Sequence, residues 1–274
     1  MAPLSEQPQR FYKRRQETIQ FFAEILDENL TLEMVKIPAG TFTMGSPDDE
    51  PERFDREGPQ HDVMFKEYFM GQYPVTQAQW QFVASLTQVE CALEAHPSNF
   101  DGANLPVEKV SWYEAIEFCQ RLSTYTGRNY ELPTEAQWEY ACRAGTNTPF
   151  HFGNTITPEI ANYHGNSYGG GPAGDALKKT TSVDHFGIAN AFGLCDMHGN
   201  VWEWCQDLWH HSYHHKVTLT KDKKNLQREQ ADDRVARGGS WYSYAGKCRS
   251  ASRFHFRPTT SESDLGFRVI CKRP

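Results

Sequence analysis

The chain has 274 residues, a formal net charge of −7 and a pI near 5.9. This length supports one large domain or a domain with an extension, and the many apolar and aromatic residues can fill a sizeable core. The acidic balance argues against nucleic acid and anionic membrane as partners, because both select a basic face. No stretch approaches the roughly 20 consecutive apolar residues of a membrane helix.

The N-terminal residues and the cysteines indicate the compartment. Residues 1–15 are polar and lack the apolar core of a secretion signal, so we expect a cytoplasmic protein. The seven cysteines form no close C-x-x-C pair, which argues against a zinc ribbon. Reduced, mostly buried thiols are the expected state.

Residues 1–32 are predicted to form a helical extension. The segment 11–26 lacks Gly and Pro, and its apolar residues recur near helical spacing. These positions are Phe11, Thr18, Phe22, Ile25 and Leu26. We expect one amphipathic helix that packs on the main domain, because its basic cluster is short and acids follow it.

Residues 33–274 are predicted to form the main domain. Residues 35–45 alternate between apolar and polar side chains and are interrupted by Pro and Gly, a pattern that indicates short strands and a turn. Three helix starts show capping boxes, in which side chains three residues apart satisfy free backbone N–H groups. The pairs are Thr76–Gln79, Ser111–Glu114 and Thr134–Gln137, with helix ends expected near Tyr125 and Gly145. Beyond Gly145 we expect turns, loops and short strands.

Seven short motifs stand out between residues 34 and 272. They occupy residues 37–45, 74–77, 106–112, 132–139, 199–204, 237–241 and 266–269. In this order they resemble the motifs of the formylglycine-generating-enzyme (sulfatase-modifying factor) family. The resemblance implies an α+β, C-type-lectin-like fold, with two or three helices, small antiparallel sheets and much irregular loop. A shared fold does not set function.

The same resemblance implies where catalytic cysteines would stand. The family enzyme oxidises a substrate cysteine with two cysteines that bind copper(I). Counting back from Gly266 through Arg253 places these positions at Ala245 and Ser250, which offer no thiolate to that soft ion. We therefore expect no copper and name no catalytic residue. Cys248 is one nearby thiol, and we interpret it as buried and inert.

The resemblance also implies two structural calcium sites. Carboxylate, amide and carbonyl oxygens are the ligands that Ca²⁺ selects. The first set is Asn162, Tyr163, Asp175 and Leu177, and the second is Asp196, Gly199, Val201 and Glu203. The alternative is that Asn162 and Asp175 only cap turns and that Glu203 pairs with an arginine.

Residues 237–269 resemble the variable region of proteins diversified by retroelements. Between fixed motifs they carry Tyr, Ser, Phe and His, a composition that suits binding surfaces because rigid rings supply contact area. The expected partner is a protein or peptide of unknown identity. The predicted ligand-binding residues are Tyr242, Ser243, Tyr244, Ala245, Ser252, Phe254, His255, Phe256 and Arg257.

Two other functions stay open. The first is an enzyme with an altered site, built on Cys248, His255 or a metal held by the loop with His210, His211, His214 and His215. The second is a scaffold or sensor subunit that recruits a partner through its N-terminal helix.

Overall fold

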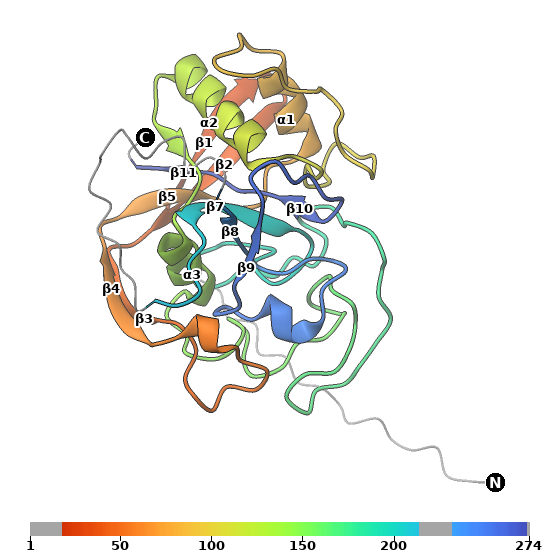
Figure 1. Cartoon of the computed structure of the whole chain (residues 1–274). Helices are drawn as coiled ribbons and strands as arrows, with labels where there is room; N and C mark the ends of the chain where they lie inside the picture. The colour runs from red at the N-terminus through yellow and green to blue at the C-terminus, as the bar shows by residue number, and fades with distance from the viewer. Residues whose placement is uncertain (1–17, 214–231, 273–274) are drawn as a thin grey trace, which may run out of the picture.

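The largest sheet joins the beginning and the end of the chain. The computed structural model describes residues 18–213 and 232–272 (Figure 1). The sheet has the strand order β1-β2-β5-β11-β6, and all its pairings are antiparallel. Its strands are Phe21–Asp27 (β1), Leu30–Ile37 (β2), Tyr68–Gly71 (β5), Tyr130–Glu131 (β6) and Ile270–Cys271 (β11).

Two smaller sheets complete the β-structure. The first has the order β10-β7-β8-β9, and the second pairs β3 with β4. Only the two-residue pairing of β10 with β7 is parallel among the described strands. The strands are Leu265–Gly266 (β10), Trp202–Leu208 (β7), Arg234–Arg237 (β8), Phe254–Phe256 (β9), Gly40–Met44 (β3) and His61–Phe65 (β4).

The described residues form three α-helices, Gln77–Ala84 (α1), Trp112–Thr126 (α2) and Glu135–Arg143 (α3). Each begins with the predicted capping box, and both reciprocal hydrogen bonds are present in all three. The helix α2 ends at Gly127, whose φ of 72° suits a residue without Cβ. None of these helices has the length and apolar content needed to cross a bilayer.

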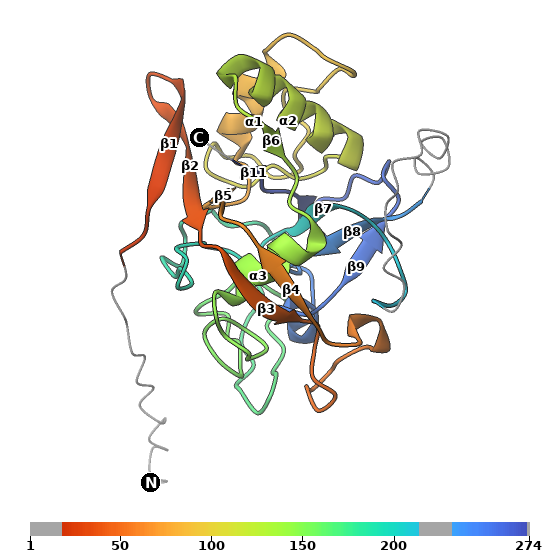
Figure 2. The ribbon, with the colours of Figure 1, turned by 90° about the vertical axis from the view of Figure 1, so that its left-hand side faces the viewer.

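Aromatic side chains fill the space between the helices and the sheets. Helices α1 and α2 lie side by side next to β1 and β2 (Figures 1 and 2). Between them the rings of Trp80 and Phe118 stack at 5.7 Å, and Phe267 meets both rings edge-on. Because Phe267 directly follows β10, this core fixes the end of the chain that carries the predicted binding segment.

The predicted N-terminal helix is wrong for the described residues. Phe21–Asp27 forms β1, whose alternating exposure turns Glu24 and Leu26 inward and Ile25 outward. Pairing with β2 overrides the local helical spacing, and Arg128 and Tyr130 both donate to the Glu24 carboxylate. The proposed boundary after residue 32 would cut β2, so residues 21–32 belong to the main domain. Residues 1–17 lie outside the described part.

The long loops of the second half follow the prediction. Past Gly145 the structure forms turns, short strands and irregular segments, including residues 154–181. Most of the charged stretch at residues 216–233 lies outside the described residues. These loops matter for function because several of them meet at the segment between β8 and β9.

Candidate binding surface and metal sites

The two positions at which the resemblance places copper-binding cysteines are both fully buried. Ala245 begins the short 3-10 helix η3 (Ala245–Cys248), and its backbone N–H donates to Asn166 Oδ1 at 2.9 Å. Ser250 Oγ accepts a hydrogen bond from Cys142 Sγ at 3.5 Å. A methyl group and an alcohol are poor partners for copper(I), so these two positions cannot form a thiolate pair.

The other candidate catalytic groups do not assemble into a site among the described residues. Cys248 is fully buried, and burial raises the pKa of its thiol, which disfavours the reactive thiolate. His214 and His215 lie outside the described residues. Within residues 18–213 and 232–272, no three His, Cys, Asp or Glu side chains gather to hold a metal ion.

Two tyrosines of the predicted surface project into solvent. Tyr242 is 68% exposed and Tyr244 is 58% exposed. Between them, the Ser243 carbonyl accepts a hydrogen bond from the His164 backbone N–H at 2.9 Å, and the His164 ring lies 4.5 Å from the Tyr244 ring. We call Tyr242–Tyr244 the tyrosine turn. Its backbone is held by a neighbouring loop while its two rings remain available.

The strand β9 presents its aromatic residues on two faces. Phe254 stacks on Trp202 and Phe256 meets Trp204 edge-on, so both pack toward the core. His255 points the other way, stacks on Trp209 at 4.4 Å and approaches Asp233 Oδ2 at 2.6 Å. All three side chains are half-buried, and Arg257 beyond them is exposed. Their free edges can contribute to a surface, whereas their inner parts support the fold.

Two predicted ligand-binding residues do not belong to a surface. Ala245 and Ser252 are both fully buried. Ala245 packs in a hydrophobic cluster with Phe150 and Tyr163, and the Ser252 carbonyl accepts a hydrogen bond from Arg237. Both residues were predicted to bind ligand because small side chains are common in variable segments. In the structure they are instead part of the packed interior beneath the surface.

Buried arginine–glutamate pairs hold the segment from below, and the sequence analysis anticipated only the pairing of Glu203 with an arginine. Arg249 donates to Glu50 at 2.6 Å and to Glu57 at 2.7 Å, so it ties η3 to a loop near the N-terminus. Similar pairs join Arg237 to Glu139, Arg253 to Glu135 and Arg268 to Glu203. Part of the signal was present, because Arg237 and Arg268 stand in family motifs and Glu135 and Glu139 stand in the motif at residues 132–139.

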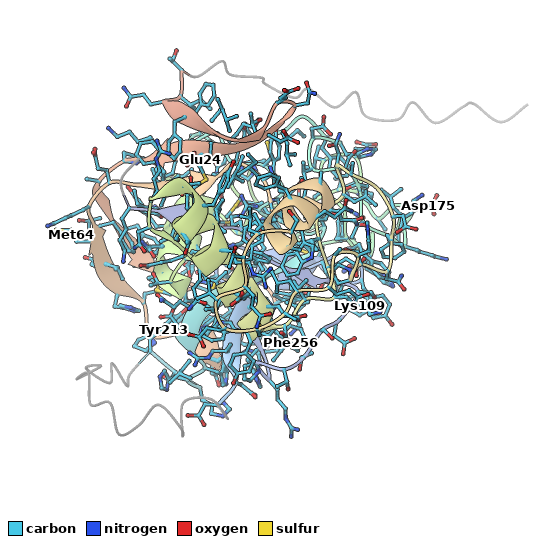
Figure 3. All side chains as sticks on the ribbon, turned by 90° about the horizontal axis from the view of Figure 1, so that it is seen from above. Glu24, Met64, Lys109, Asp175, Tyr213 and Phe256 are labelled. Atoms are coloured by element: carbon cyan, nitrogen blue, oxygen red, sulfur yellow. The ribbon has the colours of Figure 1, made fainter. Side chains whose placement is uncertain are left out.

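The first predicted calcium set combines a buried amide with exposed groups. Asn162 is buried, and its Oδ1 has no hydrogen-bond partner. Its Nδ2 donates to the Lys179 carbonyl at 2.9 Å. Asp175 and Leu177 are exposed, and Asp175 lies at the edge of the molecule (Figure 3). An unpartnered buried oxygen fits a cation that these loop oxygens would surround.

The second predicted calcium set has one free carboxylate oxygen. Asp196 Oδ2 is buried without a partner, and burial raises the pKa of this carboxyl group to about 7. Glu203, by contrast, accepts from Arg268 through both oxygens and from Trp138 Nε1 at 2.6 Å, as the alternative reading expected. Asp196 therefore fits a cation, whereas Glu203 is already neutralised by an arginine.

The two predicted calcium sets are adjacent and both support the tyrosine turn. Asn200 donates its backbone N–H to the Asn162 carbonyl at 2.8 Å, and Gly199, with φ of 108°, packs so closely on Asn162 that a Cβ would collide with it. The Asn200 carbonyl then accepts from the Trp241 N–H at 2.9 Å. Order in these loops is thus transmitted directly to the residue before Tyr242.

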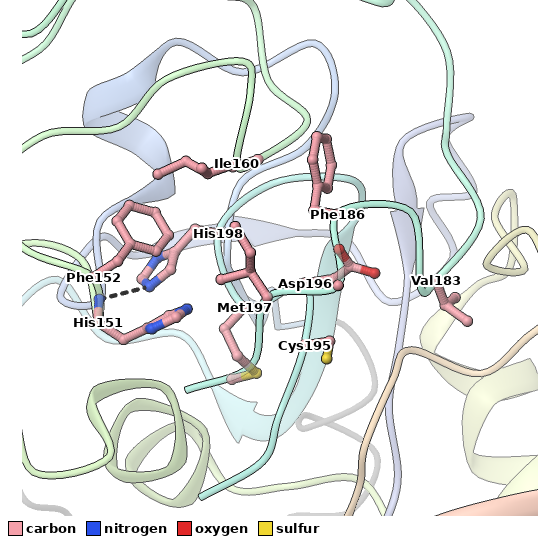
Figure 4. Close-up of a pocket in the computed structure, with 12 residues that line it drawn as sticks. His151, Phe152, Ile160, Val183, Phe186, Cys195, Asp196, Met197 and His198 are labelled. Carbon is pink, nitrogen blue, oxygen red and sulfur yellow. Dashed lines mark hydrogen bonds between the residues drawn. The ribbon is translucent and has the colours of Figure 1, made fainter. Parts of the chain in front are cut away.

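A small pocket beside Asp196 contains a pair of histidines (Figure 4). Its volume of about 10 Å³ is comparable to the space of one water molecule. His198 Nε2 accepts from the His151 backbone N–H at 3.0 Å, so Nδ1 carries the proton donated to the Cys248 carbonyl at 2.7 Å. Burial lowers the pKa of both rings, and that of His151 falls to about 4. This pair is a neutral structural contact beneath η3.

Comparison with known proteins agrees with this architecture. The mouse formylglycine-generating enzyme is 34% identical, over 86% of this chain and 74% of its own length, and the enzyme of Thermomonospora curvata is 30% identical. The structure of PvdO from Pseudomonas aeruginosa matches with a TM-score of 0.74 and 30% identity, over 95% of this chain and all of that one. Treponema denticola variable protein 1 matches with a TM-score of 0.72 and 25% identity, over 92% and 99% of the two chains.

The fold is therefore of the formylglycine-generating-enzyme type, as the motifs predicted. The sulfatase-modifying factor enzyme 1-like domain matches residues 23–273, and the chain belongs to that family. The match begins inside β1, in agreement with a main domain that includes the first hairpin.

Proposed function

We propose that this chain is a non-catalytic protein that binds a protein or peptide ligand through the tyrosine turn and the neighbouring edge of β9. One observation carries the proposal. Where the family resemblance places copper-binding cysteines, the chain has buried Ala245 and Ser250, while Tyr242 and Tyr244 beside them are exposed. Large, rigid rings on a fixed backbone provide binding area at a low cost in conformational entropy.

The similarity to a variable protein supports a binding role. Treponema denticola variable protein 1 resembles this chain over nearly its full length. The mixture of fixed arginine-containing motifs and exposed aromatic residues in residues 237–269 agrees with a constant frame that presents a changeable surface. In this account the buried ion pairs keep the frame rigid whichever residues stand in the tyrosine turn.

Calcium would have a structural role in this proposal. Asn162 and Asp196 each offer a buried oxygen without a partner, and the loops that carry them hydrogen-bond to Trp241 through Asn200. A bound Ca²⁺ would neutralise Asp196 and hold these loops together. The ion would thereby order the tyrosine turn without touching the ligand.

An enzymatic function is the competing proposal, because several relatives are named as formylglycine-generating enzymes. A copper-dependent oxidation here would need ligands other than residues 245 and 250. Another relative, from Bos taurus, is named as an inactive formylglycine-generating enzyme and is 28% identical to this chain. Membership of this family therefore does not by itself show that a protein is an active enzyme.

A selection experiment tests the binding proposal. The purified chain, in buffer with calcium, would be presented with a phage-displayed library of random peptides. We expect enriched peptides whose binding weakens when Tyr242 and Tyr244 are replaced by Ala. Failure to enrich any peptide, or equal binding to the double variant, would overturn the proposal.

A further inference from the structure

Two cations next to the proposed surface form no ion pair with any described residue. Among the residues described, the buried arginines of the main frame each pair with a glutamate. These are Arg121, Arg143, Arg237, Arg249, Arg253 and Arg268. Arg56 and Lys247 differ, because neither forms an ion pair within residues 18–213 and 232–272. Arg56 Nε is in addition buried without a hydrogen-bond acceptor.

Both cations lie over the same aromatic ring. Lys247 Nζ is 4.0 Å and Arg56 Cζ is 4.2 Å from the centroid of Phe54, which is 38% exposed. Lys247 also lies 5.9 Å from the Phe254 ring, and Arg56 lies 6.0 Å from the Trp209 ring. Cation–π contacts of this kind partly compensate two like charges, but they supply no hydrogen-bond acceptor. We call Phe54, Arg56 and Lys247 the Phe54 subsite.

The neighbouring acids offset the charge of the Phe54 subsite only in part. Glu57 is engaged by both Nη atoms of Arg249. Glu52 lies against Gly246 but forms no ion pair with Lys247 among the described residues. Burial lowers the pKa of both Lys247 and Arg56, and the Arg56 charge lowers that of Lys247 further, whereas the nearby Glu57 and Glu52 charges offset part of these shifts. An external anion would remove this repulsion.

The Phe54 subsite is continuous with the proposed surface. Lys247 belongs to η3, which directly follows Tyr244, and its second ring contact is to Phe254 on β9. Arg56 belongs to the 3-10 helix η1 (Asp55–Glu57), which lies beside η3 in the lower half of Figure 1. A peptide that crosses the tyrosine turn can therefore reach this subsite.

We propose that the Phe54 subsite recognises an acidic side chain of the peptide ligand, with an apolar neighbour of that side chain packed on Phe54. This proposal rests on the proposed binding function and defines its ligand class. Charge complementarity supports it, because a carboxylate can accept from Lys247 Nζ beside the positive Arg56 guanidinium, and neither side chain forms an ion pair within the described residues.

The selected peptides and a charge-reversed variant test the proposal. We expect the peptides enriched on the wild-type chain to be rich in Asp and Glu, and to bind Lys247→Glu about 10- to 100-fold more weakly. Lys66→Glu is the matched control, because it makes the same charge change at an exposed lysine between β4 and β5. Binding to the wild-type chain should also weaken as salt is raised. Lys247→Met and Arg56→Gln serve if the charge reversal lowers the melting temperature.

Three outcomes separate the two proposals. Acidic peptides that lose affinity for Lys247→Glu but not for Lys66→Glu support the Phe54 subsite. Peptides without acidic enrichment that bind every Lys247 and Arg56 variant equally, yet lose affinity for the tyrosine variants, overturn the subsite and leave the binding function intact. If no peptide is enriched, the binding function falls and this inference falls with it.

Discussion

Tyr242 and Tyr244 combine an exposed ring with a fixed backbone. Most other tyrosines of the described chain are buried or half-buried, and Tyr163 and Tyr168 belong to the hydrophobic cluster beneath η3. The two exposed rings contribute little to that cluster. Substitutions at these two residues should therefore change the affinity for the ligand without changing the stability of the fold.

Replacing either tyrosine by Ala should weaken ligand binding about tenfold or more, in the range of central interface residues. The free energy of unfolding should change by about 0.5 kcal/mol or less, as is usual at exposed positions. Tyr125→Ala, at another tyrosine that is half exposed, is the control and should leave binding unchanged. Titration calorimetry and urea unfolding measure the two quantities. A large loss of stability in the tyrosine-turn variants would count against a surface role.

Asp196 gives a pH-dependent test of the metal site. In the absence of metal, burial raises the pKa of Asp196 to about 7, above the value of the unfolded chain. The folded state then binds more protons, so Asp196 should lower stability as pH rises from about 4 to about 7. Asp196→Asn should remove this loss and stabilise the metal-free protein by about 1–3 kcal/mol at pH 8. The same variant should lose its response to calcium. Thermal unfolding with and without calcium decides the matter, and an unchanged calcium response would exclude Asp196 as a ligand.

Among the elements, the buried ion pairs connect segments that are far apart in the sequence. Arg249 links η3 to the loop that carries Glu50 and Glu57. Arg249→Met should destabilise the fold by about 3–5 kcal/mol, because it leaves two buried carboxylates without a cation. The loss should be smaller at pH 4, where Glu50, whose pKa is already raised by burial, can be protonated.

The triple variant Arg249→Met, Glu50→Gln, Glu57→Gln is the control for this prediction. It removes the buried charges together, so part of the stability should return. Denaturant unfolding at two pH values provides the comparison. Equal stability of the single and triple variants would show that the ion pair is not what holds η3.

The sequence predicted some elements better than others, for physical reasons. The three helix starts were predictable because a capping box is a local interaction within four residues. The strand β1 was not, because Glu24 is turned inward by Arg128 and Tyr130 from distant positions. Likewise the exposure of Tyr242 followed from the pattern, whereas the burial of Ser252 depended on contacts with Arg237.

At the scale of the whole molecule, the irregular half of the chain depends on contacts between loops. Residues 154–201 contain no helix or strand, yet they hydrogen-bond to the tyrosine turn through His164 and to the preceding Trp241 through Asn200. A fold of this kind should respond as a unit to an ion that binds these loops. This is the reason to expect calcium to affect stability and ligand binding together.

Calcium at about 100 times its dissociation constant should stabilise the fold by about 2.7 kcal/mol per site. The melting temperature should rise by roughly 5–10 °C, and affinity for selected peptides should rise in parallel. Chelation by EGTA and re-addition of calcium or magnesium would be followed by calorimetry and peptide binding. Identical melting curves with and without chelator would contradict a structural calcium.

The most direct test of the binding proposal against copper chemistry is a copper(I) titration of the reduced protein, with elemental analysis of the same sample. We expect bound calcium but no tightly bound copper, because Ala245 and Ser250 cannot supply the thiolate pair that copper(I) selects. The variant Ala245→Cys with Ser250→Cys is the comparison, and any copper uptake should appear only there. Tight, stoichiometric copper binding by the wild-type chain would contradict the non-catalytic binding proposal and favour an oxidase function.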